Sequence, residues 1–275
     1  MRLPAYASIR QRIAYWCFIV FCALVFLFLV APLAAIIPLS FNSSTFLTYP
    51  LSGVSLRWYE IFFSSTAWQL SIRNTFIVGT AAALLATTLG TLAALGMSRP
   101  NFPWRGVVMA LVVSPMVVPF VITALGMFFF FSRVGLTNSL AGLIVAHTAL
   151  GVPFVVITVS ATLQGFDRNL PRAAASLGGR PFYVFRRVTL PVIAPGVTVG
   201  ALFAFVTSFD EVVVAVFLVG PRQRTLPRQM FSGIRENIDP TIAAAATFMM
   251  VISVFLLIAV ELLRRRSERL RGLRK

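Results

Sequence analysis

Two adjacent carboxylates, Asp210 and Glu211, stand in a stretch of chain built otherwise from Val, Phe, Ala and Leu. A carboxylate in an apolar membrane segment is costly unless it faces water or a partner. Because carboxylates attract cations, the pair predicts a path that accepts a cationic solute. Successive helix residues point about 100° apart, so we expect only one of the two to face the path. A structural hydrogen-bond pair between helices is the alternative.

The chain offers little for catalysis. Its only lysine is Lys275, so it cannot contain the Gly-x-x-x-x-Gly-Lys-Ser/Thr loop that binds nucleotide phosphates. Its single histidine, His147, belongs to no His-Glu-x-x-His motif and is either a hydrogen-bonded packing residue or a site residue. Cys17 and Cys22 match no metal spacing and are interpreted as packing residues. We expect no enzyme activity, no metal and no cofactor, with any ATP-driven work done by a partner.

A polar segment, residues 164–191, connects two apolar runs and contains the sequence DRNLPRAAASLGGRPFYVFRRVTLP. Its three alanines favour a helix with one face thin enough for close approach to another protein. Gly178 and Gly179 should end that helix, and Pro191 suits the first turn of the next one. The segment predicts a short docking helix tied at both ends to membrane helices. An ordinary amphipathic interfacial loop is the alternative.

The elements that position these residues are membrane helices. Of the 275 residues 58% are hydrophobic, with a mean hydropathy of +0.88, against about 45–50% apolar in soluble chains. Continuous apolar runs, unlike alternating strands, indicate helices of about 20 residues rather than a barrel. We expect one all-α bundle, a single domain over 1–275, with six spans near residues 13–39, 72–97, 106–131, 140–163, 192–219 and 242–263. Pro115 and Pro119 break the third, either as a hinge or as packing geometry.

The basic residues indicate an orientation. Most of the 24 lysines and arginines fall on one side if both ends of the chain are cytoplasmic, which gives an N-in, C-in topology and a cytoplasmic docking loop. The net charge of +16 does not predict nucleic-acid binding, because no basic stripe is interleaved with aromatics. The basic tail from Arg264 to Lys275 is expected to rest on anionic membrane lipid, at about 1 kcal/mol per basic residue.

The docking segment resembles the EAA loop of ABC-importer permeases. That pattern is Glu-Ala-Ala, three residues, Gly, nine residues, then Ile-x-Leu-Pro. Here Arg172-Ala173-Ala174 is followed at the same spacings by Gly178 and by Val188-Thr189-Leu190-Pro191. The departures are Arg172 for Glu and Val188 for Ile.

Further segments resemble the polyamine (spermidine/putrescine) branch of this family in order and spacing. They include Ser114-Pro115, Ser208-Phe209-Asp210-Glu211 and Gly220-Pro221. The resemblance implies a multi-pass protein of the bacterial inner membrane. It also implies three kinds of partner: a second, homologous permease subunit, a pair of ABC ATPase subunits expected to be a homodimer, and a periplasmic substrate-binding protein.

The resemblance implies a site of contact with the ATPase, and the carboxylate pair described above predicts the translocation path. The ATPase would contact Arg172, Ala173, Ala174, Leu177, Gly178, Leu190 and Pro191. The family glutamate helps to seat the loop in the ATPase, so Arg172 needs a different contact, and docking would rest on the alanine face, Leu177 and the Gly178 turn. Asp210 and Glu211 would line the translocation path.

The expected function is therefore that of a permease subunit forming half of the path for polyamines or a related small cationic or amino-bearing solute. Within the same class, the alternative is an anionic or zwitterionic solute such as an aminophosphonate, an opine or iron(III), which Arg222, Arg224, Arg228 and Arg235 would favour. A different class is a secondary transporter or channel, which would need inverted repeats or a ring of pore charges.

Overall fold

The computed structural model describes residues 8–99, 102–167, 169–236 and 238–270, without the side chains of 264 and 266–270. Residues 271–275 of the basic tail, Lys275 included, lie outside it. The described chain is helical, with no strand beyond one isolated bridge between Asn42 and Val54. The helices are α1 (Ile9–Ser40), α2 (Arg57–Ser64), α3 (Thr66–Met97), α4 (Arg105–Val117), α5 (Phe120–Arg133), α6 (Leu140–Gln164), α7 (Asn169–Ser176), α8 (Pro181–Val184), α9 (Leu190–Phe209), α10 (Val213–Leu218), α11 (Leu226–Glu236) and α12 (Thr241–Leu270), with a π-helical turn η1 (Phe185–Thr189) and a 3-10 turn η2 (Pro221–Gln223).

The expectation of an all-α membrane bundle is confirmed. Five helical runs of the described chain are long and apolar enough to cross a membrane, and α4 with α5 makes a sixth if that pair is one span. The pair is bent by 105° at residues 118–119. Pro119 explains the break, since its ring removes a backbone donor and disfavours helix at the residue before it.

The centre of the bundle is a three-helix packing of α3, α6 and α9. Small side chains let the backbones approach closely, as they do in many membrane helix pairs. Gly200 of α9 is one such position, because a Cβ there would lie 2.9 Å from Val155 Cα of α6. Ala86, Val159 and Ala204 are buried in the same interface. The close contact between α6 and α9 therefore depends on small side chains at these positions.

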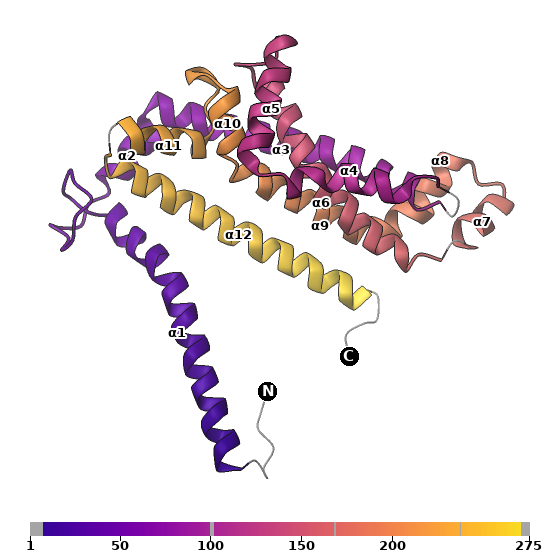
Figure 1. Cartoon of the computed structure of the whole chain (residues 1–275), viewed down its shortest axis with the longest axis horizontal. Helices are drawn as coiled ribbons and strands as arrows, with labels where there is room; N and C mark the ends of the chain where they lie inside the picture. The colour runs from indigo at the N-terminus through magenta and orange to yellow at the C-terminus, as the bar shows by residue number, and fades with distance from the viewer. Residues whose placement is uncertain (1–7, 100–101, 168, 237, 271–275) are drawn as a thin grey trace.

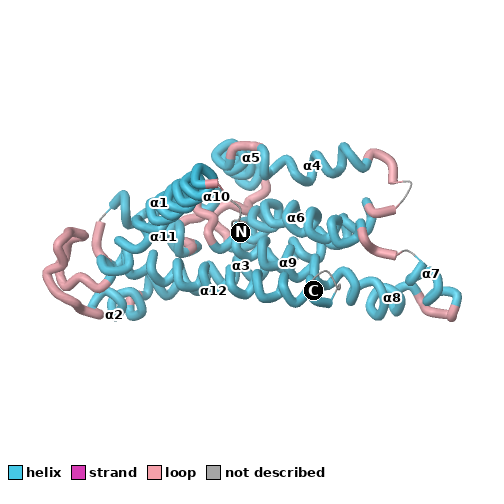
Figure 2. The backbone as a smooth tube through the Cα atoms, turned by 90° about the horizontal axis from the view of Figure 1, so that it is seen from below, coloured by secondary structure: helices cyan, strands magenta, loops and turns pink. Residues whose placement is uncertain are grey.

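Helix α1 stands away from this centre (Figure 1). Ser40, at its end, is the only buried residue among those of α1. The short helices α2 and α11 lie at one end of the bundle, and α7 and α8 lie at the opposite end (Figures 1 and 2). The two ends therefore carry different surfaces.

The fifth apolar run differs from the expected single helix over residues 192–219. Helix α9 ends at Phe209, residues 210–212 are not helical, and α10 begins at Val213. The side chain of Glu211 bonds to the first N–H groups of α10, and a polar side chain that satisfies backbone donors in this way favours a new helix start over continuation. Asp210 and Glu211 are thus not successive residues of one helix, and the expected 100° separation does not apply.

The start of the same run also differs from expectation. Pro191 lies in the first turn of α9, as expected, but α9 continues a helical run that begins ten residues earlier at Pro181 and passes through α8 and η1. Pro181 occupies the first turn, where a missing N–H costs little. The π-helical turn at Phe185–Thr189 directly precedes Pro191, and a wider turn accommodates a proline that cannot donate a hydrogen bond.

Candidate translocation path and coupling helix

Glu211 is a buried cap on α10. The N–H of Val214 donates to its Oε1 at 2.7 Å, and the N–H of Ala215 donates to its Oε2 at 3.1 Å. Only 6% of the residue is exposed. A carboxylate that accepts two backbone N–H bonds at a helix start is stabilised both by those bonds and by the helix dipole. Both oxygens of Glu211 are therefore engaged inside the protein.

His147 joins Glu211 to the end of α9. Its Nδ1 is hydrogen-bonded to Ser208 Oγ at 2.7 Å. Its Nε2 lies 3.4 Å from Glu211 Oε2, within ion-pair distance but not aligned for a hydrogen bond. All three residues are buried. The hydrogen-bonded role considered for His147 is present: its hydrogen-bond partner Ser208 lies in the last turn of α9, and Glu211 lies in the break that follows.

Asp210 has a contrasting environment. It is exposed, and it lines two cavities, one of about 490 Å³ beside α12 and one of about 410 Å³ beside α5 and α6. Phe120, Phe154 and Val206 are among the apolar walls of the second cavity. The structure therefore separates the two carboxylates, with Asp210 facing open space and Glu211 held by protein.

The arginines that favoured an anionic solute lie at the end of the bundle that carries α11. Asn74 of α3 donates hydrogen bonds to the carbonyl oxygens of Arg222 and Arg224, at 3.1 and 3.0 Å, which fixes this segment. Arg224 Nη1 donates to Gln229 Oε1 at 3.2 Å, and Arg228 bonds to the hydroxyl of Ser232. Neither cavity beside Asp210 has an arginine in its lining.

The docking segment folds as expected at its first half. Helix α7 contains Arg172, Ala173 and Ala174, and Gly178 ends it with a φ of +85°. The N–H of Gly179 bonds to Ala174 O at 3.0 Å and the N–H of Gly178 to Ala175 O at 2.9 Å. This pair of bonds is a Schellman motif, which needs a left-handed residue and so favours glycine.

The seven residues predicted to contact an ATPase are divided between two segments, α7 with the turn that ends it and the start of α9. Arg172, Ala173, Leu177 and Gly178 are exposed on or just after α7, with Leu177 88% exposed. Leu190 and Pro191 lie instead inside the helical run that leads to Asp210. The motif thus spans a surface helix and the helix that it is joined to.

Sequence reasoning missed two exposed aromatic residues at this end. Phe182 is 73% exposed and Tyr183 58% exposed, both on α8 next to α7. Exposed aromatic side chains are typical of protein interfaces. Their signal in the sequence was the aromatic pair directly after Pro181, between Arg180 and the pair Arg186-Arg187.

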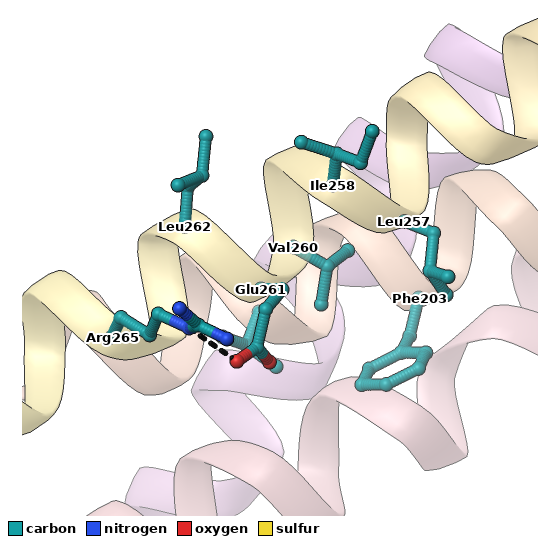
Figure 3. A pocket seen from close by; sticks show the side chains of 8 residues that line it. Phe203, Leu257, Ile258, Val260, Glu261, Leu262 and Arg265 are labelled. Carbon is teal, nitrogen blue, oxygen red and sulfur yellow. Dashed lines mark hydrogen bonds and ion pairs between the residues drawn. The ribbon is translucent and has the colours of Figure 1, made fainter.

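A third cavity, of about 620 Å³, opens between α9 and α12. Figure 3 shows Phe203 of α9 beneath Leu257 of α12, with the carboxylate of Glu261 bonded to Arg265 at the end of the groove. The walls are otherwise aliphatic. Among the described residues, no group of three or more His, Cys, Asp or Glu side chains could hold a metal ion.

Comparison with known proteins gives the family. Residues 86–269 match the family described as the binding-protein-dependent transport system inner membrane component. The chain belongs to this family. It is a transport subunit of the ABC importers and not an enzyme, and the alternative of a self-contained secondary transporter or channel is set aside.

Several relatives are similar over most of their length. The chain is 29% identical over 245 residues to the spermidine/putrescine transport system permease protein PotC of Escherichia coli K12, covering 89% of this chain and 92% of that protein. It is 34% identical over 241 residues to the putrescine transport system permease protein PotI of the same organism, covering 84% and 85%. A crystal structure of a bacterial ABC transporter that imports the polysaccharide alginate has the same fold, with a TM-score of 0.73 at 15% identity over 94% of this chain and 98% of that one.

Proposed function

We propose that this permease subunit forms half of a path for polyamines or a closely related small cationic or amino-bearing solute. The observation that carries the proposal is the exposed carboxylate of Asp210 in cavities without an arginine. Asp210 is the one carboxylate in the lining of the larger cavity, and in the smaller cavity it is joined by Glu211, whose oxygens are bonded to α10. A single free carboxylate among mostly apolar walls attracts an ammonium group without binding it so tightly that it cannot leave. The relatives PotC and PotI, named for spermidine and putrescine, support this substrate class.

Coupling to ATP hydrolysis would follow from the helix that links α7 to Asp210. The run Pro181–Phe209 contains 29 residues, about 43 Å of continuous helix. It begins beside α7 and ends at Asp210. Motion of an ATPase bound to α7, Leu177 and the exposed Phe182 would therefore reach the path through one rigid rod. Arg172 is exposed and free to meet an acidic group of the ATPase in place of the family glutamate contact.

The remaining partners are assigned to the other surfaces. A second permease subunit and membrane lipid would cover α1, which is apolar and almost wholly exposed. The aliphatic groove of Figure 3 offers lipid a further contact. A periplasmic binding protein would dock at the end formed by α2 and α11, opposite to α7. This arrangement requires both ends of the chain in the cytoplasm, as the distribution of basic residues indicates.

The test is uptake by the assembled importer. The complex, co-purified with its ATPase, its second permease and its binding protein, is reconstituted in proteoliposomes with ATP inside. We expect ATP-dependent uptake of radiolabelled putrescine that requires the binding protein. Uptake of an aminophosphonate or of iron(III) in place of putrescine would refute the cationic substrate and leave the transport role intact.

A further inference from the structure

We propose that His147 is a positioning residue of the translocation path, acting through Nε2 on Glu211, and that it keeps the Glu211 carboxylate bonded to α10 so that, of the two carboxylates, only Asp210 is free to bind the solute. The proposal rests on the proposed function, since it gives the proposed path its single free carboxylate. It adds a residue from α6, a helix that neither the docking motif nor the carboxylate pair includes.

The His147 and Glu211 side chains are both buried. His147 is 1% exposed and Glu211 6% exposed, in a bundle whose outer surface is apolar. A buried carboxylate is costly unless it is paired and hydrogen-bonded. The two backbone N–H groups of Val214 and Ala215 supply part of that stabilisation. His147 is the ionisable partner that completes it, because its Nε2 is 3.4 Å from Oε2.

Ser208 orients the imidazole ring of His147. Ser208 Oγ lies 2.7 Å from Nδ1, so a hydroxyl that donates to Nδ1 leaves the ring proton on Nε2, the nitrogen that lies 3.4 Å from Glu211 Oε2. A doubly protonated ring would present the same proton. In either state Ser208 orients the imidazole and Nε2 acts on the carboxylate. The three residues therefore form an ordered contact from the last turn of α9, through α6, to the start of α10.

The position of the Glu211 carboxylate affects the charge in the path. Glu211 is bonded to the first N–H groups of α10 and is adjacent in sequence to Asp210. The Glu211 carboxylate is held at the wall of the cavity of about 410 Å³ that both residues line, and without that restraint it would be free to turn into the cavity beside Asp210. Two free carboxylates would hold a cation more tightly and slow its release. By holding Glu211, His147 thus favours the passage of the cationic solute over its retention in the path.

The experiment separates the two ring nitrogens. In His147→Gln the side-chain amide can approach the place of Nε2, whereas in His147→Asn it can approach only the place of Nδ1. We expect the Asn variant to lower the maximal rate of putrescine uptake at least about tenfold, as for a buried charge that loses its partner. The Gln variant should keep most of it. The half-saturating putrescine concentration, set by the binding protein, should not change in either. Thr148→Val is the matched control, because Thr148 bonds only within α6, to Ile144 O.

Two results would overturn the proposal: uptake in the Asn variant equal to or above that in the Gln variant, or parental uptake in both. If neither variant transports, a double-mutant cycle decides. The midpoints of thermal unfolding are measured for His147→Asn, Glu211→Gln and the double variant in the assembled complex. Losses that are clearly less than additive support direct pairing, and additive losses refute it. These midpoints need no substrate, so they remain readable if the parental complex fails to take up putrescine, which would refute the proposed function instead.

Discussion

The clearest prediction contrasts the two adjacent carboxylates. Asp210→Asn should impair transport and leave stability unchanged, whereas Glu211→Gln should destabilise the protein. The structure gives the reason. Among the described residues no hydrogen bond or ion pair of the Asp210 carboxylate is found, whereas Glu211 accepts two backbone N–H bonds and lies beside His147.

The magnitudes follow from these contacts. A glutamine has one acceptor oxygen where the carboxylate of Glu211 has two, so one buried N–H loses its acceptor and the other loses a charged one. That should cost about 2–4 kcal/mol, or roughly 5 °C or more in the unfolding midpoint of a chain of this size. For Asp210→Asn we expect a change within about 0.5 kcal/mol.

Asp210→Asn should lower the rate of transport, although it leaves stability unchanged. Two unit charges 4 Å apart attract by about 4 kcal/mol at an effective dielectric constant of 20. If about a third of that attraction acts as the solute passes, its loss lowers uptake about tenfold. The assay pairs thermal unfolding of the purified complex with putrescine uptake in proteoliposomes. Parental uptake by Asp210→Asn, or an unchanged midpoint in Glu211→Gln, would refute the assignment of one carboxylate to the path and the other to α10.

Three further predictions concern coupling, orientation and packing. The variants Gly178→Pro and Ala174→Asp should insert normally but should abolish transport and weaken co-purification of the ATPase. Gly178→Asn should retain both transport and ATPase binding, because asparagine tolerates a positive φ. Normal transport in the first two variants would mean that the loop only connects two helices. A reporter active only in the cytoplasm should give signal when fused after Gly179 and none after Arg224, and the reverse pattern would invert the topology. Gly200→Ala should lower the free energy of unfolding by about 1–3 kcal/mol, because the new Cβ overpacks against Val155, and the unfolding midpoint measures this loss. Gly96→Ala should leave the midpoint unchanged, because nothing lies within 4 Å of the new Cβ. Equal effects of the two substitutions would mean that α6 and α9 are not closely packed at Gly200.

The sequence by itself determined the class of protein and the approximate places of its apolar helices. Apolar runs of membrane length predict spans because a bilayer leaves a backbone no partner except its own helix. The glycine stop of the α7 helix was predicted, since a residue such as Gly178 readily adopts the left-handed conformation that follows a helix end. These are local properties, and a linear sequence contains them.

Only the tertiary structure decided which carboxylate is exposed and which is buried. The chain reads as a continuous apolar run to Val219, and the break after Phe209 depends on Glu211 bonding to Val214 and Ala215. His147 stands more than sixty residues before Glu211, and nothing in the intervening sequence indicates that the two meet. A contact of this kind comes from the close packing of α6 against α9, where Gly200 leaves room for Val155. Local preferences set where helices can begin and end, but the pairing of a buried charge is set by whatever the packed neighbour presents to it.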